Sequence, residues 1–312
     1  MKNKKTEGII IKGTCLTFGQ KEAVEEGGDL HMNYTLTDDG VLTISGNTLL
    51  GCSSAVEGVP LYDQPMYDYP DEGKPEDYWS RFTSQFKDID FHTVVIENGV
   101  KCLGVLCFKD CKNFRKIVLP EEMPVIRKTF AMGSPLEYHE KDGLLFLGPP
   151  SNPLYYLMGC KDDFDKETLI IPEGTVYIAD YAFKDKKCIK EVRFPSTLEF
   201  AGWYTFDDTS IKDVFIPEGK LAYDETLIAF DGKDINLESI SVPYSMYKEY
   251  KEGNDRGWVE AANRTAKIIF RNTDDSIAEI LQPHPLAYGD KCDAINNESP
   301  FTPDSGSDEL PF

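Results

Sequence analysis

The stretch IIPEGTVYIADYAFKDKKCIKEVRFP, residues 170–195, contains the pattern that decides the fold. Apolar residues precede Pro172, a segment with apolar residues at mixed spacings leads to Phe183, and an alternating apolar run ends at Pro195. Alternation with a period of two predicts a half-buried strand, whereas the mixed spacings favour a short helical turn. Proline ends each run because it lacks an N–H donor and fixes φ.

The same phrase recurs along the chain at a nearly constant interval. Pro172, Pro195 and Pro217 are 23 and 22 residues apart. The distance from aromatic residue to proline is also kept, at 12 residues from Phe183 to Pro195 and 11 from Phe206 to Pro217. Intervals of this length are typical of leucine-rich repeats. Because one such unit cannot bury its own apolar face, we expect neighbouring units to stack.

The apolar runs should place alternate side chains in a shared core. We expect these inward-facing residues to be buried: Leu169, Ile171, Val192, Phe194, Val214 and Ile216. Phe183 and Phe206 should fill the core beneath the turns on the other side. The pattern predicts a β-rich α/β solenoid, right-handed, with one short parallel strand in each repeat of about 22–23 residues.

These phrases resemble the BspA-like leucine-rich repeat, whose unit reads approximately I-P-x-x-V-x-x-I-x-x-x-A-F-x-x-C-x-x-L-x-x-I. Residues 170–195 are the best copy, and residues 94–120, VVIENGVKCLGVLCFKDCKNFRKIVLP, are the next. Residues 33–47 are similar to the hairpin that precedes such arrays, and residues 142–162 to an interruption between units. The resemblance covers roughly residues 30–270 and implies a surface or secreted protein of gut or oral bacteria.

Composition and pattern divide the chain into four segments. They are residues 1–28, a leader or linker; residues 29–90, an N-terminal hairpin and capping helix; residues 91–270, the repeats, with an interruption near residues 138–166; and residues 271–312, an acidic, Pro-containing tail expected to be disordered.

Short patterns near both ends predict the elements that close the array. The run that alternates around Asp38–Gly40 is typical of a hairpin, because glycine supplies a positive φ. Aromatic residues at i, i+4 and i+8 predict a capping helix over residues 77–86. At the other end we expect a helical cap over residues 244–262 and a last strand over residues 266–270.

The charge balance argues against two classes of partner. Asp and Glu total 54 against 33 Lys and Arg, a formal net charge of −21, so the surface repels nucleic-acid phosphates and anionic lipid headgroups. No window approaches the roughly 18 consecutive apolar residues that a membrane-spanning helix needs. We therefore expect a protein or glycan partner, no nucleic acid and no membrane-spanning segment.

Cysteine and histidine spacing gives little support for a metal site. Cys102, Cys107 and Cys111 are close in sequence, but a zinc site needs a second pair of ligands and none follows. Cys107 and Cys111 are better explained as small buried thiols in the reduced state. The histidines are scattered without catalytic or metal-binding pairing: His31, His92, His139 and His284. The sequence predicts no catalytic residue, no metal site and no cofactor.

The outward side of the strands is the candidate binding surface. Aromatic, apolar and charged residues gather there at the second and fourth positions before each proline, and contiguous exposed apolar residues often mark interfaces. The expected partner-binding residues are Val95, Val118, Ile170, Glu191, Arg193, Asp213 and Phe215. The alternative is that β-branched residues simply favour strands, or that a loop covers them.

Three functions are compatible with these patterns. The resemblance favours a secreted or cell-surface adhesion or protein-interaction module of a host-associated bacterium, with no enzymatic activity. An intracellular scaffold of the same fold is the alternative, because residues near the start lack a signal-peptide core and a cytoplasmic location stays open. A hydrolase on a β-rich scaffold is the third, because sites made only of carboxylates leave no motif.

Overall fold

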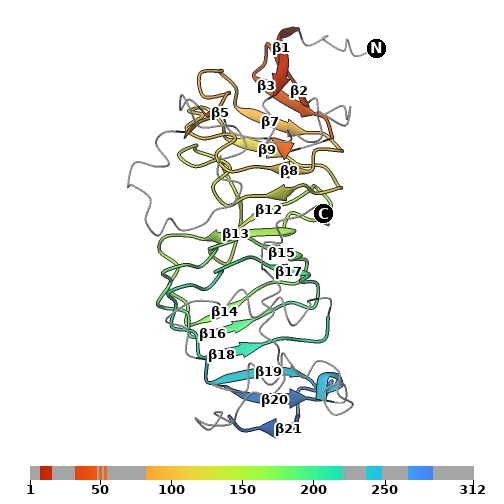
Figure 1. Cartoon of the computed structure of the whole chain (residues 1–312), viewed down its shortest axis with the longest axis vertical. Coiled ribbons are helices and arrows are strands. Elements are labelled where there is room, and N and C mark those ends of the chain that lie inside the picture. The colour runs from red at the N-terminus through yellow and green to blue at the C-terminus, as the bar shows by residue number, and fades with distance from the viewer. Residues whose placement is uncertain are drawn as a thin grey trace, which may run out of the picture.

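Strands dominate the structure and stack along its long axis, with β1 to β3 near one end and β19 to β21 at the other (Figure 1). A computed structural model describes residues 8–15, 32–47, 49–50, 53–54, 82–219, 221, 237–247 and 266–283. Within these ranges the α-helical residues are 244–247, a single turn. The described part of the protein is therefore built from strands and turns, with almost no helix.

The strands of the described residues form five sheets. The first has the order β1 (Ile9–Cys15), β2 (Met32–Thr37), β3 (Val41–Ser45), β7 (Thr93–Ile96) and β9 (Lys116–Val118). The second has the order β14 (Thr168–Ile170), β16 (Glu191–Arg193), β18 (Asp213–Phe215), β19 (Ser239–Pro243), β20 (Lys267–Arg271) and β21 (Ile277–Leu281). The third is β10 (Val125–Ile126), β8 (Cys102–Leu103) and β4 (Leu49–Leu50). The fourth has the order β11 (His139–Lys141), β12 (Leu144–Leu147), β13 (Tyr156–Cys160), β15 (Tyr177–Ile178) and β17 (Phe200–Ala201). The fifth consists of β5 (Ser53–Ser54) and β6 (Phe82–Thr83).

Successive repeats return the chain to the same register in the second sheet. Strands β14, β16, β18, β19 and β20 pair in parallel, and one inward-facing residue of each is aligned with the next: Leu169, Val192, Val214, Ile240 and Ile268. All five are buried, as are the other inward residues predicted from the alternation. The period-two pattern therefore assigned the inward side of these strands correctly.

Stacked aromatic rings fill the core on the turn side of the repeats. Phe183 and Phe206 are fully buried and their rings lie parallel, with centroids 5.5 Å apart. Phe108 and Phe130 are also fully buried at the equivalent place in earlier units. Buried aromatic pairs of this kind contribute beyond the area they bury. The predicted role of Phe183 and Phe206 is confirmed.

The turn side of the repeats differs from the predicted short helical turn. Tyr177 pairs in parallel with Phe200, and the two short strands β15 and β17 replace helix there. Left-handed residues then redirect the chain, at Tyr181 with φ 53° and Asp185 with φ 65°, and again one unit later at Tyr204 and Asp208. A residue with positive φ interrupts a right-handed helix, which explains why none forms.

The N-terminal region corrects two expectations. Part of the expected leader or linker is strand β1, which pairs antiparallel with β2 of the predicted hairpin β2–β3. The capping helix predicted over residues 77–86 is absent from its described part, because Phe82–Thr83 is strand β6 and residues 85–88 form a turn. Phe86 is fully buried against Phe108, with centroids 5.3 Å apart, so the aromatic spacing reflected tertiary packing. Residues 77–81 lie outside the described residues.

Two expectations for the C-terminal region are also wrong. The strand predicted over residues 266–270 is not the last, because β21 pairs antiparallel with β20, Ile269 opposite Ile280. The expected disordered tail therefore begins with a turn and a strand as far as residue 281. Of the helical cap predicted over residues 244–262, residues 244–247 are helical and the remainder lies outside the described residues.

Candidate partner-binding face

The outward side of β14, β16, β18 and β19, called the strand face below, carries two aligned rows of side chains. The row nearer the strand starts is Thr168, Glu191, Asp213 and Ser239. The row nearer the strand ends is Ile170, Arg193, Phe215 and Ser241. Both rows were predicted residue for residue, because strand side chains two apart share a face.

The structure divides the seven candidate residues into two groups. Val95 and Val118 are paired on β7 and β9, which belong to the first sheet. The other five lie on the strand face, and the interruption β11 to β13 comes between the two groups in the chain. The two sheets stand at different heights along the long axis (Figure 1). One continuous column across all repeats was expected, and two separate patches are observed.

Exposure on the strand face is uneven. Ile170 is 65% exposed, the largest value among the large hydrophobic residues that are exposed. Phe215 is half-buried, whereas Ser239 and Ser241 are buried. The apolar surface available to a partner is therefore concentrated at Ile170 on β14 and Phe215 on β18.

Phe215 lies between two guanidinium groups. Arg193 on β16 has its guanidinium carbon 5.6 Å from the centroid of the Phe215 ring, and Arg271 on β20 reaches within 6.0 Å of it. Cation–π contacts extend to about 6 Å and hold such side chains in place. The spacing of Pro195 and Pro217 predicts that Arg193 and Phe215 are neighbours, whereas Arg271 lies in the segment that was expected to be a disordered tail. The alignment of Arg271 with Pro243 on β19 would have revealed it, had the last strand been extended by one residue.

Carboxylates on the strand face moderate this positive charge. Glu191 accepts a hydrogen bond from Arg193, with Oε1 2.6 Å from Nε. Asp213 is exposed on the adjacent strand and accepts a hydrogen bond from Ser239. Just before β18, Lys212 forms an ion pair with Glu238, which raises the pKa of Lys212 through the hydrogen bond between them. Basic and acidic groups therefore alternate over a short distance, which favours a partner of mixed charge.

The cysteines near residue 107 are core residues. Cys107 and Cys111 are 0% and 1% exposed, and Ser84 donates a hydrogen bond to the backbone oxygen of Cys107. Within the described ranges, no group of three or more His, Cys, Asp or Glu residues could hold a metal ion. Burial raises the pKa of Cys111 to about 11. The location predicted for both thiols is confirmed.

We expect Cys107 and Cys111 to resist alkylation in the native protein and to react once it unfolds. Burial keeps the reagent away from both thiols, and the raised pKa of Cys111 leaves little of its reactive thiolate at neutral pH. Iodoacetamide labelling followed by peptide mass spectrometry measures this, and the half-exposed Cys188 is an internal control that should react earlier. Rapid native labelling of either buried thiol, or a disulfide mapped between them, would contradict the assignment.

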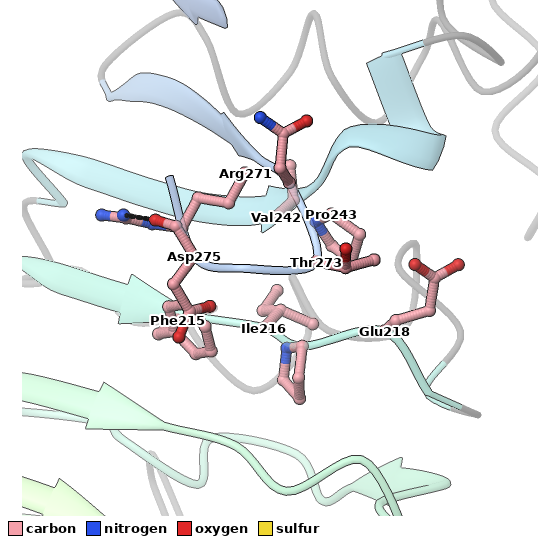
Figure 2. Close-up of a pocket in the computed structure, with 10 residues that line it drawn as sticks. Phe215, Ile216, Glu218, Val242, Pro243, Arg271, Thr273 and Asp275 are labelled. Carbon is pink, nitrogen blue, oxygen red and sulfur yellow. Dashed lines mark hydrogen bonds between the residues drawn. The ribbon is translucent and has the colours of Figure 1, made fainter. Parts of the chain in front are cut away.

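A pocket adjoins the strand face at the ends of β18, β19 and β20 (Figure 2). Its walls are residues 215–218 and the turn at residues 271–275, so Phe215 belongs to both the strand face and the pocket, and Arg271 of β20 contacts the Phe215 ring from the pocket. Sequence analysis did not predict it, because the turn that forms one wall lies in the expected tail. The pocket gives the strand face a concave end.

Family comparison identifies the repeats. Residues 82–139 and 161–251 match the model of the BspA type leucine rich repeat region, in six copies. Among curated proteins, none is detectably similar to the chain. Within the described residues, no helix is long and apolar enough to cross a membrane.

Several solved structures are similar over part of the chain. One is a leucine rich cell surface protein from Faecalibacterium prausnitzii, with 20% identity and a TM-score of 0.26 over 50% of this chain and 55% of that protein. The chain thus spans about half the length of that relative. The pneumococcal vaccine antigen PcpA has 12% identity and a TM-score of 0.27 over 69% of this chain and 80% of its own. A leucine-rich repeat protein from Bacteroides ovatus has 14% identity and a TM-score of 0.23 over 68% and 63%.

Proposed function

Because this chain is a protein with BspA-type leucine-rich repeats, we propose that it is a non-catalytic interaction module that binds a partner protein through the strand face. In this proposal the units stack as a right-handed solenoid and present the strand face on one side. The module acts as an adhesion or protein-interaction element at the surface of a host-associated bacterium. The location rests on the family, in which many members are surface or secreted proteins.

The position of Phe215 is the observation that carries the proposal. A half-buried aromatic ring held between the guanidiniums of Arg193 and Arg271 is a rigid anchor, because both cations limit its motion. Aromatic and arginine side chains contribute most of the energy at many protein interfaces. Ile170, two strands away in the same row, adds exposed apolar surface. Together they form the centre that a partner would desolvate.

Charge on the strand face supports a protein partner over an anionic polymer. The chain carries a net charge of −21, and Glu191 and Asp213 flank the arginine. A polyanion would be repelled by this field, whereas a protein surface with both signs of charge could complement it. The proposal is thus specific to partners with some positive charge near an apolar centre.

A charge placed at Ile170 tests the proposal. The purified chain is presented to a panel of extracellular proteins and a glycan array, and each hit is measured again with Ile170→Asp. We expect at least about tenfold weaker binding, because the substitution removes the exposed apolar surface of Ile170 and places a carboxylate that must be desolvated at the apolar centre. Stability should be unchanged, since Ile170 is mostly exposed.

Trp203→Asp is the matched control, because Trp203 is 43% exposed and lies in the turn after β17, outside the strand face. It should leave binding within about twofold, as expected for a residue outside the interface. A hit that binds Ile170→Asp normally but loses affinity for Trp203→Asp would assign binding to the turn side. Absence of any binding across the panel would also count against an adhesion role.

A further inference from the structure

The pocket beside the strand face is small and half enclosed. Its volume is about 370 Å³, close to the lower end of the roughly 300–1,000 Å³ that is usual for small-ligand sites. Residues 215–218, Val242 and Pro243 of β19 and the turn at residues 271–275 line it (Figure 2). It has room for the end of a chain but not for an extended segment.

Arg271 is an oriented cation at one end of the pocket. Its Nε donates a hydrogen bond to Ser241 Oγ at 3.2 Å, and its Nη1 donates to the backbone oxygen of Asp275 at 2.9 Å. These bonds and the Phe215 ring fix the guanidinium, yet they use only two of its five N–H donors. Among the described residues, no carboxylate lies within ion-pair distance of Arg271. Its remaining donors match a planar carboxylate.

The rest of the pocket is apolar at its floor and carries two carboxylates, Asp275 in the turn that follows Arg271 and Glu218 at the far end. Ile216, Val242 and Pro243 are buried and provide an aliphatic floor. The exposed Glu218 lies at the end of the view opposite Phe215 (Figure 2). A ligand that fits this order has a carboxylate, then an apolar side chain, and then an N–H donor within reach of Glu218.

We propose that this pocket binds the C-terminal carboxylate and the apolar last side chain of a peptide segment. The carboxylate pairs with Arg271, the side chain lies on Ile216 and Val242, and a backbone N–H of the segment donates to Glu218. An acidic sugar offers the same carboxylate, but its hydroxyl groups would lie on the apolar floor without hydrogen-bond partners. The inference rests on the proposed function, and it names the part of the partner protein that is recognised.

Short peptides with and without a charged C-terminus test this inference. The probes are fluorescent peptides that end in Leu, Ile, Val or Phe, each made with a free carboxylate and as the amide. We expect the free acids to bind the full chain at least about tenfold more tightly than the amides, because hydrogen bonds to a charged group are the stronger ones. Arg271→Met should abolish that difference. Arg271→Lys should keep part of it, because lysine retains the positive charge but lacks the two parallel N–H donors of the guanidinium.

Lys267→Met is the matched control, because Lys267 lies on the same strand and outside the pocket. It should leave the preference for the free acid intact. Thermal melts of both Arg271 variants show whether the sheet is preserved, and the lysine variant keeps the test valid if the methionine variant unfolds.

Equal binding of acids and amides, or no binding of any free acid, would overturn the pocket assignment. Binding of glucuronic acid or N-acetylneuraminic acid in place of the peptides would assign the pocket to an acidic sugar. Ile170→Asp separates this inference from the proposed function, because Ile170 is not part of the pocket. If Arg271→Met spares a partner that Ile170→Asp disrupts, the strand face stands and the pocket fails. If Arg271→Met disrupts binding of a partner that Ile170→Asp spares, the pocket assignment stands and the strand-face proposal fails.

Discussion

Replacement of Phe183 by alanine should lower the free energy of unfolding by about 3–5 kcal/mol, the usual loss when a buried aromatic site is emptied. Phe183 is fully buried, its ring stacks on Phe206 at 5.5 Å, and its backbone N–H donates to Thr205 O at 2.9 Å. The backbone bond survives the substitution, so the loss reports on packing. Equilibrium unfolding in denaturant measures it.

Trp203→Ala is the control, because that ring is 43% exposed in the next unit. Its loss should stay below about 1 kcal/mol, as is usual for surface substitutions. If Phe183→Ala also changed stability by less than about 1 kcal/mol, the stacked aromatic core would not be what holds adjacent units together. An intermediate that unfolds only residues around 183 would show that units melt separately, as repeat arrays can.

The strands and their faces could be predicted because two features of the sequence determine them, the alternation of apolar residues and the spacing between prolines. Alternation assigned Leu169 and Val192 to the core, and the spacing between prolines alone aligned Arg193 with Phe215. Both features depend on local geometry: a strand has a period of two, and equal repeat lengths place equal positions side by side. The candidate face on the second sheet could therefore be predicted residue by residue.

The turn side could not be predicted in the same way. Its apolar residues have mixed spacings, and whether they form a helix depends on single backbone angles. Asp185 adopts a positive φ, as aspartate does more often than most residues, but Tyr181 also adopts one, which its residue type does not indicate. The capping helix predicted over residues 77–86 failed for a related reason. The spacing of Phe86 from earlier aromatic residues matches that of a helix, but its ring packs on Phe108.

Arg271 and the pocket were missed because they belong to a strand pair with no repeat pattern. Strand β21 is antiparallel to β20, and its exposed Ile277 and Ile280 give no inward period to read. Arg271, at the end of β20, lies over Phe215, a contact between residues 56 positions apart. Residues that cover the end of the repeats do not follow the repeat spacing. Their contacts therefore cannot be predicted from that spacing.

The double substitution Arg193→Ala with Phe215→Ala should weaken binding to a partner found on the strand face by at least about 2 kcal/mol, roughly thirtyfold. Both side chains sit in the middle of one row, and their contact at 5.6 Å means that each supports the orientation of the other. Loss of both removes the aromatic anchor and the cation together. The melting transition should hardly move, because Arg193 is exposed and Phe215 is only half-buried.

The matched control is Lys187→Ala with Trp203→Ala, which also removes one cation and one aromatic ring but from the turns. Titration calorimetry of the parent chain and the two double variants with the same partner is the decisive measurement. Binding through the strand face predicts a loss of roughly thirtyfold for Arg193→Ala with Phe215→Ala and a change within about twofold for the control. Normal binding by the strand-face variant, with loss in the control, would contradict it and assign the interaction to the turn side.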